Sequence, residues 1–225
     1  MRSGTAQRLP RLYPILDAEL VLREVGADRE KRHALLARLA QELAEAGVEI
    51  LQYRNKRDED ELIAEDVRAI REAARGTGRI PMRLILNDRV ALAARLSCDG
   101  VHVGQEDLSP SQARLLLGPE AIIGFSTHNV EQVIAADREP VDYIAIGPVF
   151  ATASKANPDP VIGLEGVRRA RALTQKPLVA IGGMTAETVG AVVAAGADAV
   201  AVIAAIFGAG RPVGQSARDF LAVLQ

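Results

Sequence analysis

Short apolar runs alternate with longer helix-period segments along almost the whole chain, and this alternation restricts the fold more than any other feature. The runs have the length and the near-continuous apolar character of strands buried in a parallel sheet. They lie at residues 12–16, 49–53, 83–86, 100–103, 121–125, 142–146, 178–181 and 198–202. Because strands that alternate with helices form parallel sheets with right-handed crossovers, the sequence predicts an α/β fold.

The segments between the runs have the pattern of amphipathic helices. In residues 29–47 and 59–76, Leu, Ile and Ala recur at three- and four-residue spacing opposite charged faces. Several segments end in a glycine, a common helix stop, at Gly47, Gly76 and Gly196. Eight strands and eight helices favour a closed (β/α)₈ TIM barrel over an open doubly wound sheet. The first strand also lacks the glycine-rich turn of nucleotide-binding sheets.

A single domain accounts for the length and the composition. The chain has 225 residues, of which 48% are hydrophobic, and this is enough for one sizeable core. We expect residues 1–10 to form a flexible N-terminal tail and residues 11–225 to form the catalytic barrel. The longest loop, residues 151–163, is long for a compact domain, and such loops usually serve a function.

Charge and cysteine content limit the partners and the location. The 27 basic and 29 acidic residues give a net charge of −2, which provides no broad field for nucleic acid or a membrane surface. No secretory or membrane segment is visible in the sequence. The single cysteine, Cys98, excludes an internal disulfide and fits a reducing compartment. We therefore expect a cytoplasmic protein that acts on small molecules, and we leave a homo-oligomer open.

Cationic and amide side chains follow the second predicted strand, at the end of a barrel where active sites lie. Strand alternation puts Gln52, Arg54 and Lys56 on one side. Two cations at a barrel mouth require anionic partners. A diphosphate would satisfy them, since arginine binds it bidentately and lysine binds it as a point charge. The alternative is that both cations belong to the solvated start of the next helix.

Asp88 and Asp107 follow adjacent predicted strands, so their carboxylates could converge. Mg²⁺ is usually held by one or two carboxylates together with phosphate oxygens of the substrate. This combination makes a metal site the favoured interpretation. The alternative for each residue is a helix N-cap, although Ser109 before Pro110 is the better cap for the helix after Asp107.

The loops after the last three strands could hold phosphate groups. Gly182 and Gly183 would let backbone N–H groups approach an anion, and the turn after Ile203 could do so at the start of the eighth helix. The alternative for the glycine pair is a tight turn. Lys155 in the long loop could close over a diphosphate, or could be an ordinary exposed lysine.

Histidine chemistry is not indicated. His102 alternates with valines on the fourth predicted strand, so its side chain is expected to face the barrel interior. A hydrogen-bonded core histidine is a better interpretation than a catalytic base. The sequence shows no Ser-His-Asp, zinc or Schiff-base pattern.

Taken together, the motifs resemble the thiamine phosphate synthase family. In order, they are QYRNK, LNDR, GVHVGQEDL, IIGFSTH, YIAIGPVFATASK, VAIGGMT and GADAVAVIAAIF, and the resemblance runs from LYPILD to AIFG. The family fold is a (β/α)₈ barrel. The resemblance implies a transferase that joins an aminopyrimidine diphosphate to a thiazole phosphate. It would release diphosphate by a dissociative substitution that is assisted by Mg²⁺.

The resemblance also implies roles at the matching positions. Asp88 and Asp107 would hold Mg²⁺. The residues implied in catalysis are Arg54, Lys56, Ser126 and Lys155. The implied substrate contacts are Gln52, Tyr53, Arg54, Asn55, Lys56, Asn87, Ser126, Thr152, Ala153, Ser154, Lys155, Gly183, Ile203 and Ala204.

Two departures and two rival functions accompany this resemblance. The family often has serine at the position of Ala204 and a second threonine at Ser154, so the affinity for the thiazole phosphate is in question. One rival is the related thiazole tautomerase, an isomerase that shares the phosphate loops. The other is a barrel that binds thiazole phosphate without catalysis. QYRNK, Asp88, Asp107 and Lys155 together favour the synthase.

Overall fold

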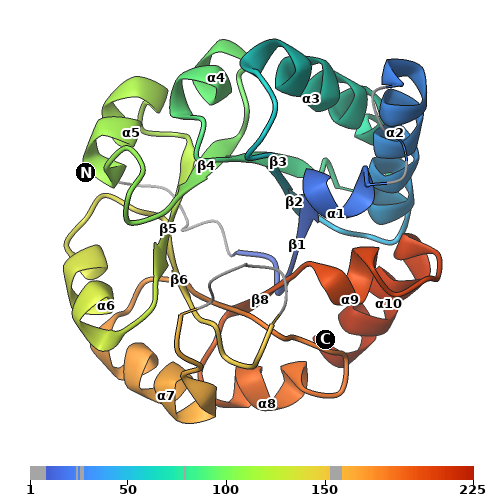
Figure 1. Cartoon of the computed structure of the whole chain (residues 1–225). Coiled ribbons are helices and arrows are strands. Elements are labelled where there is room, and N and C mark those ends of the chain that lie inside the picture. Colours follow the sequence, from blue (N-terminus) through green and yellow to red (C-terminus); the bar gives the residue numbers. More distant parts are fainter. Residues whose placement is uncertain (1–8, 24, 26–27, 79, 153–158) are drawn as a thin grey trace.

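The computed structural model of the chain describes residues 9–23, 25, 28–78, 80–152 and 159–225. Eight parallel strands form a closed barrel, in which each strand bonds to the next and β8 bonds to β1. Figure 1 looks along this barrel and shows the helices as an outer ring around the strands. The predicted single (β/α)₈ barrel is confirmed.

The eight strands coincide with the predicted apolar runs to within two residues at either end. They are β1 (Leu12–Asp17), β2 (Ile50–Arg54), β3 (Arg83–Asn87), β4 (Gly100–Val103), β5 (Ile122–Thr127), β6 (Tyr143–Ile146), β7 (Leu178–Ile181) and β8 (Ala199–Val202).

Eight helices cover the barrel. They are α2 (Arg29–Glu45), α3 (Asp60–Ala74), α4 (Val90–Arg95), α5 (Pro110–Leu117), α6 (Val130–Asp137), α7 (Gly163–Leu173), α8 (Val189–Ala194) and α10 (Val213–Val223). The described residues also contain two four-residue helices at the C-terminal rim, α1 (Ala18–Val21) and α9 (Ala204–Phe207). The helix expected to start after Ile203 is therefore the short α9, and α10 is the helix that covers the barrel after β8.

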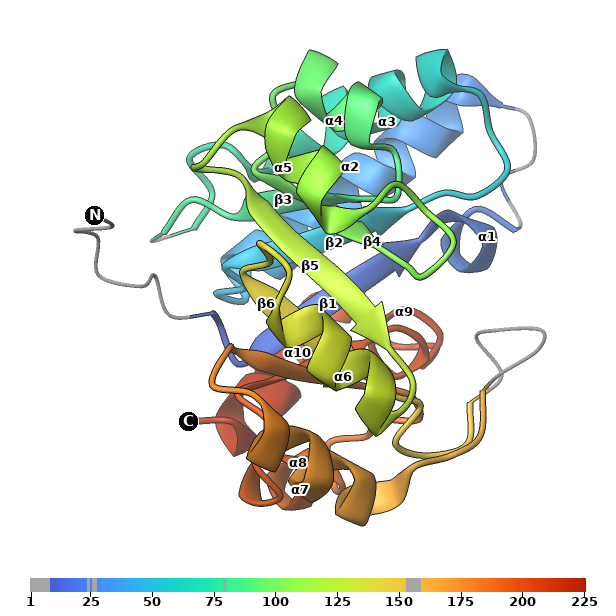
Figure 2. The same cartoon turned by 90° about the vertical axis from the view of Figure 1, so that its left-hand side faces the viewer.

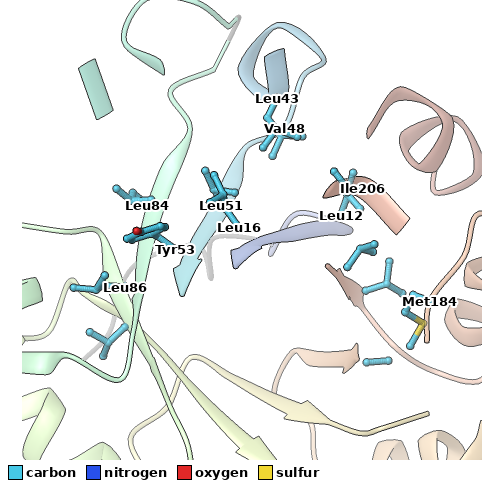
Figure 3. Close-up of a cluster of buried hydrophobic side chains, with 14 of the residues drawn as sticks. Leu12, Leu16, Leu43, Val48, Leu51, Tyr53, Leu84, Leu86, Met184 and Ile206 are labelled. Atoms are coloured by element: carbon cyan, nitrogen blue, oxygen red, sulfur yellow. The ribbon is translucent and has the colours of Figure 1, made fainter. Parts of the chain in front are cut away.

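Side-chain alternation along the strands builds two apolar layers. Leu12 of β1 and Leu51 of β2 belong to the outer layer, where they pack with Leu43 of α2 (Figure 3). Ile15 and Ile85 belong to a separate cluster that fills the barrel interior. The core is therefore continuous around the barrel, and the barrel itself is not a pore.

The described part of the chain begins within the expected tail over residues 1–10. Residues 1–8 lie outside the described part. Leu9 is only 7% exposed and belongs to the interior cluster with Tyr13 and Ile15. Leu9 thus gains burial by packing into the N-terminal end of the barrel, and the tail expected over residues 1–10 stays a prediction.

The loops at the C-terminal ends of the strands form one face of the molecule. In Figure 2, β5 points toward the edge where α1 and the segment between β6 and α7 lie. Active sites of such barrels are built on this face. No helix in the described ranges is long and apolar enough to cross a membrane.

Candidate active site

Arg54 is held at the barrel mouth by a carboxylate on the neighbouring strand. It ends β2 and is in register with Asp17, the last residue of β1. Its Nη1 donates to Asp17 Oδ2, while Asp17 Oδ1 accepts from the backbone N–H of Leu20 at 3.3 Å. Asp17 was missed from the sequence. Its position directly after an apolar strand was the signal, the same one that identified Asp88.

Lys56 and Asp88 form a second charge pair on the same side. Lys56 Nζ donates to Asp88 Oδ2, and Arg89 Nε lies 3.7 Å from Asp88 Oδ1. Asp88 has a φ of 53°, a left-handed conformation that aspartate tolerates better than most residues. The N-cap of α4 is Arg89, with no side-chain cap bond. The helix-cap alternative for Asp88 is therefore wrong.

Asp107 is fixed in the loop between β4 and α5. Its Oδ2 accepts from the backbone N–H of Gly104 at 2.7 Å. The helix that follows is capped by Ser109, which forms a capping box with Gln112. Asp107 is thus also free of a capping role, and its side chain remains partly exposed at the mouth.

The oxygen atoms at the ends of β3 and β4 fit the preferences of Mg²⁺. Asp88 and Asp107 supply carboxylates, and the adjacent Asn87 has a buried Oδ1 that lacks a hydrogen-bond partner among the described residues. Within those residues, no group of three or more His, Cys, Asp or Glu side chains could hold a metal ion by itself. A site of this kind suits a metal that shares its coordination with substrate phosphate.

Polar side chains cross the barrel interior beneath the mouth. Asn87 Nδ2 donates to Gln52 Oε1 at 3.2 Å, and Gln52 Nε2 donates to Tyr13 Oη at 3.2 Å. The hydroxyls of Tyr13 and Tyr143 are 2.9 Å apart, and their rings meet edge to face. The two tyrosines were not predicted as site residues because each lies in an apolar strand.

The same series of bonds continues to Ser126. The Tyr143 hydroxyl lies 2.9 Å from His102 Nδ1, and His102 Nε2 lies 2.8 Å from Ser126 Oγ. The rings of His102 and Tyr143 are stacked with centroids 5.6 Å apart. Gln105 Nε2 donates to the backbone oxygen of Ser126 at 2.5 Å. The interior position expected for His102 is confirmed.

Burial keeps this interior chain uncharged. It lowers the pKa of His102 to about 4, an effect that Asp107 opposes and Lys56 reinforces. Burial also raises the pKa values of Tyr13 and Tyr143 above the ordinary value for tyrosine. At neutral pH, therefore, a neutral imidazole and two intact phenols lie below the charged rim.

The side chains of Tyr53 and Asn55 lie outside the mouth, and their predicted substrate contacts stay predictions. Tyr53 faces the helix layer (Figure 3) and donates to Asp66 Oδ2 at 2.5 Å. Asn55 donates to Tyr53 Oη at 3.2 Å and to Asp58 at 2.9 Å, and its Oδ1 accepts from the backbone N–H groups of Arg57 and Asp58. Alternation along β2 is the reason, because Gln52 and Arg54 take the inward positions.

A buried ion pair supports this loop from behind. Arg32 of α2 donates from Nε to Asp66 Oδ1 at 2.7 Å and from Nη2 to Asp58 Oδ2 at 2.7 Å. Asp66 is fully buried. Burial alone would lower the pKa of Arg32, but the hydrogen bonds that it donates to Asp66 and Asp58 raise it overall. Tyr53, Asn55 and Arg32 therefore act on the shape of the loop that carries Arg54 and Lys56.

The loop after β6 packs against the glycine pair after β7. Val149 N donates to Ile181 O at 2.9 Å, and Phe150 N donates to Gly182 O at 3.1 Å. Gly183 has a φ of 62°, and an added Cβ there would lie 2.5 Å from Ala151 O. The pair forms a tight turn, and its predicted phosphate contact stays a prediction. Thr152 lies partly exposed at the end of this packed segment.

The remaining predicted phosphate contacts have different outcomes. Ile203 and Ala204 lie at the start of α9, where Ile203 provides no side-chain cap. The first N–H groups of a helix lack intrahelical partners and so can bind anions. Ala153, Ser154 and Lys155 lie outside the described residues. Their predicted roles stay predictions.

Comparison with known proteins places this geometry in a family. The family model described as thiamine monophosphate synthase matches residues 25–206. The chain is 49% identical over 226 residues to the thiamine-phosphate synthase of Koribacter versatilis, with 100% of this chain and 99% of the relative covered. It is 45% identical over 192 residues to the Agrobacterium fabrum thiamine-phosphate synthase, with 83% of this chain and 86% of the relative covered.

A solved structure agrees with the sequence relatives. The thiamine phosphate pyrophosphorylase of Pyrococcus furiosus superposes with a TM-score of 0.77 at 28% identity, and 95% of each chain is covered. The similarity thus extends over the barrel as well as over the motifs at its rim. The chain belongs to the thiamine monophosphate synthase family.

Proposed function

We propose that the chain joins 4-amino-2-methyl-5-hydroxymethylpyrimidine diphosphate to thiazole phosphate, giving thiamine phosphate and diphosphate. Membership of the family makes the chain a transferase, and the isomerase alternative is not favoured. The observation that carries the proposal is the placement of two cationic side chains beside carboxylates at the mouth. Arg54 pairs with Asp17, and Lys56 pairs with Asp88. This arrangement suits a diphosphate that arrives with a divalent metal.

The proposed reaction is a substitution at the methylene carbon of the pyrimidine. The carbon–oxygen bond to diphosphate breaks, and its electron pair leaves with the diphosphate. The aminopyrimidine ring stabilises the cation that remains, and the thiazole nitrogen supplies the electron pair of the new carbon–nitrogen bond. No proton has to be removed by the protein, which agrees with the neutral, buried state of His102.

The residues at the mouth meet the demands of this step. Arg54 and Lys56 would stabilise the negative charge that grows on the leaving group, and Lys155 would add a third cation. Asp88 and Asp107 would hold Mg²⁺, which when bound supplies further positive charge to the leaving diphosphate. Ser126 would contact the pyrimidine ring from β5. Binding both substrates in one orientation would supply much of the remaining acceleration.

The thiazole phosphate would bind at the opposite side of the mouth. Its support is the glycine pair Gly182 and Gly183 beside the loop that reaches Thr152, together with the backbone at Ile203 and Ala204. Ala204 lacks the hydroxyl that the family often has there, so backbone N–H groups would hold this phosphate. A cytoplasmic location belongs to the same proposal, supported by the buried free thiol of Cys98.

The test is to mix the purified protein with both substrates and Mg²⁺ and to measure thiamine phosphate after oxidation to fluorescent thiochrome. We expect product that disappears when the metal is chelated. Product formation that persists with the metal removed would contradict the metal role. Thiazole phosphate binding without any product would instead support the non-catalytic binding barrel.

A further inference from the structure

The hydrogen bonds that cross the barrel interior form one continuous series from β3 to β5. They run from Asn87 through Gln52, Tyr13, Tyr143 and His102 to Ser126. The series begins beside the proposed metal site and ends at the partly exposed Ser126 in the mouth. Three of its members, Tyr13, Tyr143 and His102, have no place in the proposed reaction.

The direction of the series is set at its first residue. The backbone oxygen of His102 can only accept, and it lies 3.5 Å from Asn87 Nδ2. The amide nitrogen of Asn87 must therefore face this oxygen, since the reversed amide would put two oxygen atoms together. The same Nδ2 donates to Gln52 Oε1 at 3.2 Å, so the Gln52 nitrogen faces Tyr13.

Each later bond then follows from counting protons. Tyr13 Oη accepts from Gln52, so its own proton goes to the Tyr143 oxygen 2.9 Å away. Tyr143 in turn gives its single proton to His102 Nδ1. A neutral imidazole that accepts at Nδ1 carries its proton on Nε2, and this proton is donated to Ser126 Oγ. In this arrangement, every hydroxyl proton of the two tyrosines has an acceptor.

Packing holds the central member of the series in place. Gly124 of β5 is in register with Tyr143, and the phenol ring occupies the space that a side chain there would need. An added Cβ at Gly124 would lie 2.0 Å from Tyr143 Cζ. The ring is also stacked on His102. Tyr143 can therefore not turn its hydroxyl away without moving two neighbouring strands.

We propose that Tyr13, Tyr143 and His102 are positioning residues, which orient Ser126 so that its hydroxyl donates a hydrogen bond to the pyrimidine substrate. Because Ser126 Oγ already accepts from His102, its own proton is left for a ligand acceptor. This inference rests on the proposed function for the identity of the ligand. A pyrimidine ring offers nitrogen acceptors of the required kind, whereas inorganic diphosphate bound at the charged rim has no ring to meet Ser126.

The direction of the series can be tested without any substrate. Imidazole ¹⁵N–¹H correlation spectra of the labelled protein distinguish the tautomers, and the chain has only 3 histidines. The His102 signals are identified by their loss in His102→Gln. We expect a neutral ring protonated on Nε2 at neutral pH, and loss of this preference in Tyr143→Phe. A ring protonated on Nδ1, or on both nitrogens, in the unmodified protein would overturn the proposal.

The positioning role is tested by calorimetric binding with Mg²⁺ present. In Tyr143→Phe, the Kd of the pyrimidine diphosphate should rise about five- to tenfold, because one oriented hydrogen bond is lost. The Kd of inorganic diphosphate should stay unchanged, since this probe meets only the charged rim. Tyr13→Phe should show the same pattern with a smaller rise, and it serves as the second variant if Tyr143→Phe does not fold.

Thr127→Val provides the matched control. Thr127 follows Ser126 on β5, is 1% exposed and donates to Ala145 O at 2.7 Å, but it faces the helix layer. The Thr127→Val substitution removes a buried hydroxyl from the same pair of strands. It should leave the Kd values of the pyrimidine diphosphate and of inorganic diphosphate unchanged. Equal weakening of both probes in Tyr143→Phe, or equal effects of Thr127→Val and Tyr143→Phe, would overturn the positioning role. A failure of the proposed function would show separately, as absent turnover in the unmodified protein.

Discussion

Lys56 and Asp88 neutralise each other at the barrel mouth, so a bound diphosphate and its metal would have to separate them. The structure places Lys56 Nζ against Asp88 Oδ2, while Asp107 is bound to its own loop through Gly104. The bound state would exchange one ion pair for two new interactions, lysine with phosphate and carboxylate with metal. Lys56 and Asp88 would therefore both act when the diphosphate and its metal bind.

Lys56 is expected to contribute directly to catalysis. Lys56→Met should lower kcat by about 100- to 1,000-fold, because one preorganised charge on the leaving group is removed. The KM for thiazole phosphate should change little. Lys31→Met is the matched control, since Lys31 pairs with Asp28 at 3.1 Å but is largely exposed on α2. Loss of activity in both variants would argue against a specific role for Lys56.

A second residue-scale prediction concerns stability against pH. Burial lowers the pKa of His102 from 6.5 to about 4, so the unfolded chain takes up a proton at a higher pH than the folded chain does. Stability should be constant above about pH 6.5 and should fall as the pH drops toward 4, by at most about 3 kcal/mol. Denaturant titrations of the unmodified protein and of His102→Gln isolate this component. Parallel pH profiles for the two proteins would contradict it.

At the scale of elements, the loop between β2 and α3 is shaped by the helices that lie behind it. Arg32 of α2 and Asp66 of α3 form a buried pair, and Tyr53 and Asn55 connect this pair to the loop. The cationic side of the loop faces the mouth, and Asp58 on its other side bonds to Arg32 of the pair. The position of Arg54 and Lys56 thus depends on how α2 packs against α3.

Asp66→Ala should therefore destabilise the protein strongly. It leaves the Arg32 guanidinium buried without its main partner, a change that typically costs about 3–5 kcal/mol. Chemical denaturation measures the loss. Asp219→Ala removes the partner of Arg211 in an exposed ion pair on α10 and should leave stability unchanged. Comparable losses in the two variants would show that burial of the Arg32 pair does not determine its contribution.

The elements themselves followed from the sequence, with specific exceptions. All eight strands were found from their apolar runs, because strands covered on both faces are apolar throughout. The helix α1 was missed, and the separation of α9 from α10 was missed, because four residues are too few to show a helical period. Tyr13 and Tyr143 were missed for a different reason. Their hydroxyls gain a polar role only when the closed barrel brings β1 and β6 face to face.

At the scale of the whole molecule, closure of the barrel brings residues from distant parts of the sequence to one mouth. Asp17, Lys56, Asp88 and Asp107 come from the ends of the first four strands, and Ser126 comes from the fifth. The sequence singled out all of these residues except Asp17, but it did not indicate their hydrogen-bond partners. Pairings such as Arg54 with Asp17 depend on strand register, which the apolar pattern alone does not specify.

A ligand bound at this mouth should stabilise the entire barrel. Inorganic diphosphate with Mg²⁺ at about 100 times its Kd should add about 2.7 kcal/mol to the free energy of unfolding. Thermal melting with and without chelator measures this effect. The Asp88→Ala, Asp107→Ala double variant should lose the Mg²⁺-dependent part. An undiminished metal-dependent shift in the double variant would exclude these two residues as the ligands.

Leu9, the buried residue that precedes β1, has a consequence for how substrates reach the barrel. Its side chain packs in the interior cluster with Tyr13 and Ile15, so these described residues fill the barrel axis on the side away from the mouth. On the proposed function, both substrates would enter, and both products would leave, at the C-terminal mouth. The pyrimidine would reach down to Ser126 and would have to bind before the thiazole covers it. The proposed function therefore predicts ordered binding, with the thiazole phosphate as the second substrate.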